Sequence, residues 1–185
     1  MLGAMQDWEL RVTGLIDHAA LQHGHREILT RYADGSEIST NWAGIRRDAL
    51  RMTQALRRLG IGEGDRIATL ALNHARHLVT WYGAVGVGGV LHTINPRLFD
   101  DQLLYIANHA EDSVLCFDMT FLPIVQAVHA RCSTVKHWVA LCEADKLPPD
   151  SGIPGLVSYE AWIAGQSDQY TWPSFDENTA SSMCY

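Results

Sequence analysis

Hydrophobic residues are most concentrated between Arg66 and Pro96, and no Asp, Glu, Lys or Arg occurs between Arg76 and Arg97. In this segment an apolar run at 67–72 is followed by a polar pair at 73–74, a helix-like stretch at 75–87 and a β-branched run at 90–94. Two continuously apolar strands joined by a helix are typical of a parallel β-α-β unit that is buried on both faces. We therefore expect helices from the rest of the chain to cover both faces of a parallel sheet.

The chain before this unit shows the patterns of two helices and a hairpin. Asp34-Gly35 lies between two β-prone runs and is a strong hairpin signal. Thr13 can cap the first helix, and Thr40 or Asn41 can cap the second. The spacing predicts helices at 13–23 and 42–59 and strands at 27–32 and 37–40, with Leu15, Ile16, Ala19, Ala20 and Leu21 on the buried side of the first helix.

After Pro96, helices and strands continue to alternate. The pattern predicts helices from 100 onward, at 121–130 and at 159–164, and strands at 113–117, 137–142 and 180–185. Such alternation with short links predicts a doubly wound α/β layer, in which ligands bind beyond the carboxyl ends of the strands. Those ends are at Asn73-His74, Asn95-Pro96-Arg97, Asp118 and Tyr185.

The expected fold class is therefore α/β: a layered, mostly parallel sheet flanked by helices, with a small N-terminal β-hairpin. Residues 1–11 are expected to form a mobile or docking arm. The chain is expected to divide into a helix-and-hairpin appendage at 1–40, an α/β layer at 41–142, a loop-rich connector at 143–178 and a terminal strand at 179–185.

Composition and charge narrow the class of protein. A length of 185 residues suits one domain, and 47% hydrophobic with 19% charged residues is ordinary for a soluble protein. The net charge of -7 and the lack of a basic stripe argue against nucleic acid, since the densest basic region, 46–58, has the spacing of a solvated helix face. The uncharged run at 77–96 approaches the about 20 residues of a membrane span, but its glycines and Asn-Pro break favour a buried helix and strand. We expect no integral membrane segment.

Cysteine and histidine patterns do not indicate a metal or disulfide framework. The four cysteines form no Cys-x-x-Cys pair and read as buried, reduced thiols of a cytoplasmic protein; they lie at 116, 132, 142 and 184. His74 and His77 are three residues apart, but no third ligand lies nearby. The polar residues from Gln6 to Arg11 argue against a signal peptide.

The most plausible ligand contacts lie in Asn95-Pro96-Arg97. Pro96 fixes the path of the chain at a strand exit, and the Arg97 guanidinium could pair with a phosphate; the alternative is that Asn95 and Pro96 simply form the turn. At the preceding strand exit, we expect Asn73 to cap the next helix, and we do not expect a direct catalytic role for His74. Trp81 and Tyr82 fit a core or interface better than a ligand pocket.

Five segments form an ordered series over nearly the whole chain, at 64–70, 73–78, 88–98, 105–112 and 176–180. They resemble the early part of AMP-forming acyl-CoA synthetases, in the branch of fatty acyl-CoA and methylmercaptopropionyl-CoA ligases. The resemblance implies that residues 1–185 are the N-terminal portion of the large AMP-binding domain, an incomplete part of an adenylate-forming enzyme. It also implies that the phosphate loop follows the strand at 179–185.

The reaction implied by the resemblance has two steps. A fatty or methylthio-alkanoic acid attacks ATP, with Mg2+, to give an acyl-adenylate, and the thiol of CoA then displaces AMP. The resemblance further implies a homodimer, and it places Asn95 and Arg97 towards the side where CoA approaches. No catalytic, cofactor-binding or metal-ligating residue is assigned within the 185 residues, which we expect to be inactive alone.

Two other functional classes compete with this interpretation. The chain could be a non-catalytic α/β module that binds a nucleotide or a protein. It could also be half of a Rossmann-type oxidoreductase, but Gly60, Gly62 and Gly64 precede a strand instead of following one, which disfavours a dinucleotide site.

Overall fold

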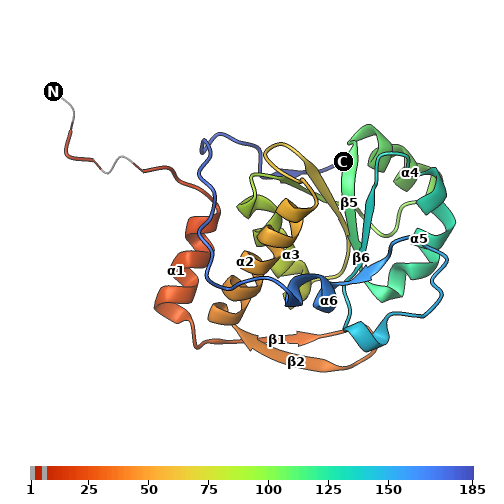
Figure 1. Ribbon diagram of the computed structural model, residues 1–185, viewed down its shortest axis with the longest axis horizontal. Helices are drawn as coiled ribbons and strands as arrows, with labels where there is room; N and C mark the ends of the chain where they lie inside the picture. Colours follow the sequence, from red (N-terminus) through yellow and green to blue (C-terminus); the bar gives the residue numbers. More distant parts are fainter. Residues whose placement is uncertain (1–2, 6–7) are drawn as a thin grey trace.

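The computed structural model describes residues 3–5 and 8–185. Its helices are α1 (Thr13–His23), α2 (Trp42–Arg58), α3 (Ala75–Gly86), α4 (Asp100–His109), α5 (Leu122–Val128) and α6 (Tyr159–Ala164). Its strands are β1 (Glu27–Arg31), β2 (Glu37–Asn41), β3 (Arg66–Leu70), β4 (Val90–Thr93), β5 (Asp112–Phe117), β6 (His137–Ala140), β7 (Val157–Ser158) and β8 (Ser182–Met183). Figure 1 shows how these elements are arranged.

The central sheet is parallel throughout, in the order β7-β6-β5-β3-β4-β8, and the hairpin β1-β2 forms a separate antiparallel sheet. Ile67 of β3 lies opposite Leu91 of β4 and Val114 of β5, which fixes the register of the central strands. The predicted α/β class, parallel sheet and N-terminal hairpin are confirmed.

Helices cover both faces of the sheet, as the two continuously apolar strands predicted. Consecutive strand residues point to opposite faces. Ile67 therefore packs into a core shared with α1, α2, α3 and α6, while the next residue, Ala68, packs into a second core shared with α4 and α5. Figure 1 shows α2 and α3 on one side of the sheet and α4 and α5 on the other.

Glycines allow α3 to pack closely against its neighbours. A Cβ atom built at Gly83 would lie 2.2 Å from a side-chain carbon of Met52, and one at Gly86 would lie 2.3 Å from the ring of Trp172. Either contact is far inside van der Waals distance, so α2 and α3 could not keep their separation with larger residues there.

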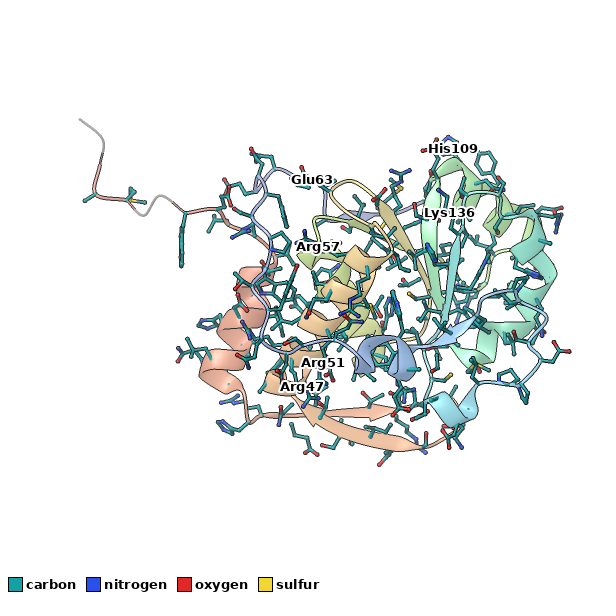
Figure 2. The ribbon with its side chains drawn as sticks, viewed as in Figure 1. Arg47, Arg51, Arg57, Glu63, His109 and Lys136 are labelled. Atoms are coloured by element: carbon teal, nitrogen blue, oxygen red, sulfur yellow. The ribbon has the colours of Figure 1, made fainter. Side chains whose placement is uncertain are left out.

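The basic face of α2 is solvated and locally paired. Arg47 and Arg51 contact the carboxylate of Asp48, and Arg57 donates to the hydroxyl of Tyr170 at 2.8 Å. Figure 2 shows Arg47, Arg51 and Arg57 along this helix. These partners support the interpretation of 46–58 as a helix face rather than a nucleic-acid site.

Several local predictions were wrong at element ends. Val12, not Thr13, precedes α1, and no side chain among the described residues caps that helix. His74, not Asn73, is the N-cap of α3; Asn41 does cap α2, accepting from the Gly44 amide at 2.8 Å. Capping depends on which backbone amide faces the side chain, and sequence spacing alone leaves two neighbouring polar residues equivalent.

Other differences concern burial and element length. Leu15 and Leu21 of α1 are 62% and 79% exposed, so only the Ile16 side of that helix is fully buried. The helix predicted at 121–130 is interrupted, because short 3-10 turns at 119–121 and 129–131 flank α5. Strand β7 was missed, since two residues are too few to show a period, and only 182–183 of the predicted terminal strand pairs with β4.

The N-terminal segment from residue 8 onward lies along the later connector. The amide of Leu10 donates to the Glu177 carboxylate at 2.6 Å, and the Arg11 guanidinium donates to the Pro173 carbonyl at 2.7 Å. These contacts favour docking for this part of the predicted arm at 1–11, while residues 1, 2, 6 and 7 lie outside the described residues. In residues 3–5 and 8–185, no helix is both long and apolar enough to cross a membrane.

Three of the four cysteines are buried, but Cys184 is exposed, which corrects the expectation that all four are buried. Burial raises the pKa of the Cys116 thiol to about 12 and that of the Cys132 thiol to about 11. The same cause, burial, raises the pKa of the Cys142 thiol to about 11. These three thiols therefore stay protonated at neutral pH, and Cys184 is the accessible thiol of the described chain.

Candidate functional site

The carboxyl edge of the sheet contains a topological switch at β3. The chain leaves β3 towards α3 on one face, whereas it leaves the neighbouring strands β4 and β5 towards α4 and α5 on the other face. Crevices open where neighbouring strands send their connections to opposite faces. The strand exits at 73–74, 95–97 and 118 therefore all lie at this edge.

The structure brings His74 and Asp118 together here. The Nε2 atom of His74 lies 2.6 Å from Oδ1 of Asp118, and the other carboxylate oxygen accepts the amide of Leu72 at 2.7 Å. His74 also accepts the His77 amide at Nδ1, at 3.1 Å, as the cap of α3. Because Nδ1 accepts, Nε2 carries the proton and donates it to Asp118. The His74 side chain is only 2% exposed, and both of its nitrogens are engaged.

His77 is likewise held by two hydrogen bonds. Its Nδ1 atom donates to the Leu72 carbonyl at 3.0 Å, which can only accept, so Nε2 accepts the Thr69 hydroxyl at 3.0 Å. Burial lowers the pKa of His77, with a smaller contribution from neighbouring His74. In this arrangement neither His74 nor His77 offers a nitrogen to a metal ion, and residues 3–5 and 8–185 contain no group of three His, Cys, Asp or Glu placed to hold one.

The hairpin is tied to the same edge through Tyr32 and Arg76. The guanidinium of Arg76 lies 4.8 Å from the centre of the Tyr32 ring, donates to the Leu141 carbonyl at 2.9 Å and pairs with the Glu143 carboxylate. The Tyr32 ring lies 5.2 Å from that of His74. Burial raises the pKa of Tyr32. Burial would also raise the pKa of Glu143, but backbone hydrogen bonding and Arg76 outweigh it and lower that pKa.

Two open cavities lie on either side of His74. The first, about 470 Å³, lies between β1 and α3 and is mostly apolar, with Ile28, Leu29, Leu78, Trp81 and Leu91 among its lining residues. The second, about 440 Å³, lies under the tip of the hairpin and is more polar, with Asp34, Asp118, Glu143 and Lys146 in its lining. Trp81 is thus half-buried at a cavity wall, whereas Tyr82 belongs to the core.

Asn95 and Arg97 do not join this cluster. Both are exposed, and Oδ1 of Asn95 accepts the Arg97 amide at 3.0 Å, which is the local hydrogen bond of an Asx turn. Neither residue lines the two cavities. Asn95 therefore forms the turn at this strand exit, and the roles of Asn95 and Arg97 towards CoA stay predictions.

Sequence reasoning placed Asp118 at a strand exit but missed its pairing with His74. The sequence did show polar residues directly after two buried strands. It could not show that they meet, because the two strands become neighbours only through the order β5-β3-β4.

Comparisons with known proteins agree with the fold. The family described as "AMP-binding enzyme" matches residues 16–183. The chain is 49% identical over its full length to a 3-methylmercaptopropionyl-CoA ligase of Ruegeria lacuscaerulensis, of which it covers 34%. It is 41% identical over its full length to a medium-chain-fatty-acid–CoA ligase of Ectopseudomonas oleovorans, again covering 34%. The chain therefore spans about a third of the length of the curated relatives that it matches.

Solved structures with the same fold include an anthranilate CoA ligase, AuaEII, in complex with anthranoyl-AMP, with a TM-score of 0.82 and 19% identity over 98% of this chain and 33% of that one. The N-terminal domain of FACL13 from Mycobacterium tuberculosis has a TM-score of 0.71 and 20% identity, over 91% of this chain and 38% of that one. At these identities the similarity establishes the fold alone.

The layered parallel sheet and the match over residues 16–183 together define a segment of an AMP-binding enzyme that covers about a third of the length of its curated relatives. The chain belongs to the AMP-binding enzyme family. The resemblance to acyl-CoA synthetases that was inferred from the segments between 64 and 180 is confirmed. Its branch is confirmed as well, since the relatives above are 3-methylmercaptopropionyl-CoA and fatty-acid–CoA ligases.

Proposed function

We propose that this chain is the N-terminal portion of the large AMP-binding domain of an ATP-dependent acyl-CoA ligase. The parent protein joins a fatty or methylthio-alkanoic acid to ATP, forming an acyl-adenylate and releasing pyrophosphate. The CoA thiol then attacks the acyl carbon, forms the thioester and releases AMP. The observation that carries this proposal is the 49% identity over the whole chain to a 3-methylmercaptopropionyl-CoA ligase.

The described residues contribute scaffold to this reaction and not its charge stabilisation. Phosphoryl and adenylyl chemistry needs a cradle of backbone amides, a metal ion and a cationic side chain. The carboxylates of Asp118 and Glu143 do not fit Mg2+, because Asp118 is engaged by His74 and Leu72 and Glu143 is paired with Arg76. We therefore assign no metal ligand here and expect the 185 residues alone to be inactive.

The contribution of the cluster is to hold two strand exits and the hairpin in fixed positions. Asp118 joins the exit of β5 to that of β3, and Thr30 accepts the Ala75 amide at 3.1 Å, which places the hairpin against the start of α3. Rigid supports of this kind keep neighbouring loops in a productive geometry.

Asn95 and Arg97 remain the residues that we propose on the CoA side. The support is their exposed position at the exit of β4 and the charge of the guanidinium, which suits a phosphate. The proposal also includes a homodimer and a cytoplasmic location. The support for the dimer is the exposure of three large apolar side chains near the N-terminus, Trp8, Leu10 and Leu15.

The test is to express the parent reading frame and measure pyrophosphate release with a panel of acids. The panel compares straight-chain fatty acids with thioether acids of matched length. We expect acid-dependent pyrophosphate release and acyl-CoA formation by the parent, and none by the 185-residue chain. A parent protein that binds ATP without releasing pyrophosphate with any acid would favour the non-catalytic nucleotide-binding module instead.

A further inference from the structure

A second histidine–aspartate pair is buried away from the cluster around His74. His92 of β4 and Asp112 of β5 are both fully buried, and Nδ1 of His92 lies 2.8 and 3.0 Å from the two carboxylate oxygens. The Nε2 atom of His92 is buried and has no hydrogen-bond partner among the described residues. Buried polar atoms in native proteins are nearly always satisfied, so this atom calls for a structural explanation.

Tyr185 lies against this pair. The ring centres of Tyr185 and His92 are 5.2 Å apart, and the Tyr185 hydroxyl lies 2.6 Å from Nδ1 of His109 at the end of α4. The His109 ring in turn stacks on Tyr105, with centres 5.3 Å apart and planes 22° from parallel. Figure 2 labels His109 at the edge of the α4 layer. Tyr185 thus connects the end of β8 to both β4 and α4.

Strand β8 needs such an additional anchor because it is short. It consists of Ser182 and Met183, which pair with Leu91 and His92 of β4. Two residues of ladder leave the direction of the following backbone weakly defined. Since β8 is parallel to β4, its exit lies at the carboxyl edge of the sheet, where ligands bind in open α/β folds.

We propose that Tyr185 is a positioning residue that fixes the direction in which the chain leaves β8. Its ring rests on His92, its hydroxyl is held by His109, and His92 is itself oriented by Asp112. The consequence for ATP use rests on the proposed function. The structural statement, that Tyr185 immobilises the exit of β8, stands independently of it.

The chain carries its own reporter for this proposal. Cys184 is exposed and lies beside Tyr185, whereas the other three cysteines are buried. A nitroxide attached to Cys184 therefore reports the mobility of the β8 exit by electron paramagnetic resonance. Tyr185→Leu removes the ring and the hydroxyl, and Tyr185→Phe removes only the hydroxyl. Tyr170→Phe is the matched control, since its hydroxyl bonds to Arg57 on α2 instead.

We expect an immobilised spectrum in the otherwise unchanged chain and in Tyr170→Phe, an intermediate spectrum in Tyr185→Phe and a mobile one in Tyr185→Leu. Equal thermal unfolding of the variants shows that only the exit has changed. A mobile label before any substitution, or a spectrum that Tyr185→Leu does not alter, overturns the proposal.

The effect of Tyr185 on ATP use is tested in the parent protein. Tyr185→Leu should raise the KM for ATP in pyrophosphate exchange by about tenfold, while Tyr185→Phe recovers most of that loss, as expected when ring packing and one hydrogen bond are removed in turn. An unchanged KM in the presence of a mobile label refutes the link to ATP use. If the parent protein shows no exchange at all, the proposed function fails, and the spin-label arm still decides the role of Tyr185.

Discussion

Replacement of Asp118 by alanine tests whether the carboxyl edge is held by the contacts described above. The Asp118 carboxylate accepts two donors, the ring of His74 at 2.6 Å and the amide of Leu72 at 2.7 Å. The side chains of His74 and Asp118 are 2% and 12% exposed, so water can replace the lost acceptor only in part. Hydrogen bonds to a charged group contribute about 1.5–3 kcal/mol each, and donors left buried without a partner add to the loss.

We therefore expect Asp118→Ala to lower the free energy of unfolding by about 3 kcal/mol, since partial access of water reduces the sum of the two bonds. For a chain of this size, that corresponds to a decrease in Tm of roughly 6–12 °C. Urea unfolding followed by circular dichroism measures the change, with the m-value as a check that the two states are otherwise alike. Asp150→Ala is the matched control, because Asp150 is exposed and accepts the amide of Gly152 in its own loop.

A double-mutant cycle separates the pair from the rest of the network. Asp118→Ala and His74→Ala should be less than additive, with a coupling energy of about 1–2 kcal/mol, because each removes the same hydrogen bond. Loss of the His74 cap contributes independently of Asp118. Additive effects, or an Asp118 variant as stable as the Asp150 control, would refute the assignment of Asp118 as the group that joins the exits of β3 and β5.

Substitutions at His77, Gly83 and Arg97 test the buried histidine, the packing of α3 and the proposed CoA side. Burial lowers the pKa of His77 in the folded state, so its neutral form contributes stability above the unfolded pKa of about 6.5, and this stability is lost as pH falls through the lower folded pKa. The free energy of unfolding, measured at pH 7.5 and 5.5, should therefore depend less on pH in His77→Gln. An unchanged pH dependence contradicts this. Gly83→Ala should destabilise the chain by about 1–3 kcal/mol through the clash with Met52. Gly14→Ala, on the open side of α1, should instead stabilise it by about 0.5–1 kcal/mol. Calorimetry that finds equal shifts in Tm for the two variants rejects the packing argument. In the parent protein, Arg97→Ala should raise the KM for CoA several-fold while acid-dependent pyrophosphate release persists, and an unchanged KM removes Arg97 from the CoA side.

The relation between sequence and fold is clearest in the segment from β3 to β4. Its helix and strands could be placed because hydrophobic periodicity and glycine positions are local properties of the chain. The start of this helix at Ala75 was placed, but its capping residue was not, since Asn73 and His74 are both capable of capping and only the final geometry selects one. The same limit applies to β7, where the two residues Val157 and Ser158 pair with β6 without any periodic signal.

The candidate site shows a different limit. The sequence identified the strand exits, and therefore Asp118, His74 and the loop at 95–97, as residues of one edge. It did not show that Asp118 meets His74 while Asn95 bonds only to the backbone two residues later. Residues 44 positions apart become partners because β5 lies directly beside β3, an order that follows from the packing of helices on both faces.

The sequence by itself determined the α/β class, the buried β-α-β unit and the family resemblance, because these depend on local patterns and on ordered motifs along the chain. Only the tertiary structure decided which polar side chains are engaged and which remain open. It paired His74 with Asp118 and His92 with Asp112, and it placed the last residue, Tyr185, on a histidine of a central strand. The physical reason is that each contact joins elements that are distant in sequence, and such contacts exist only once the strand order and helix packing are complete.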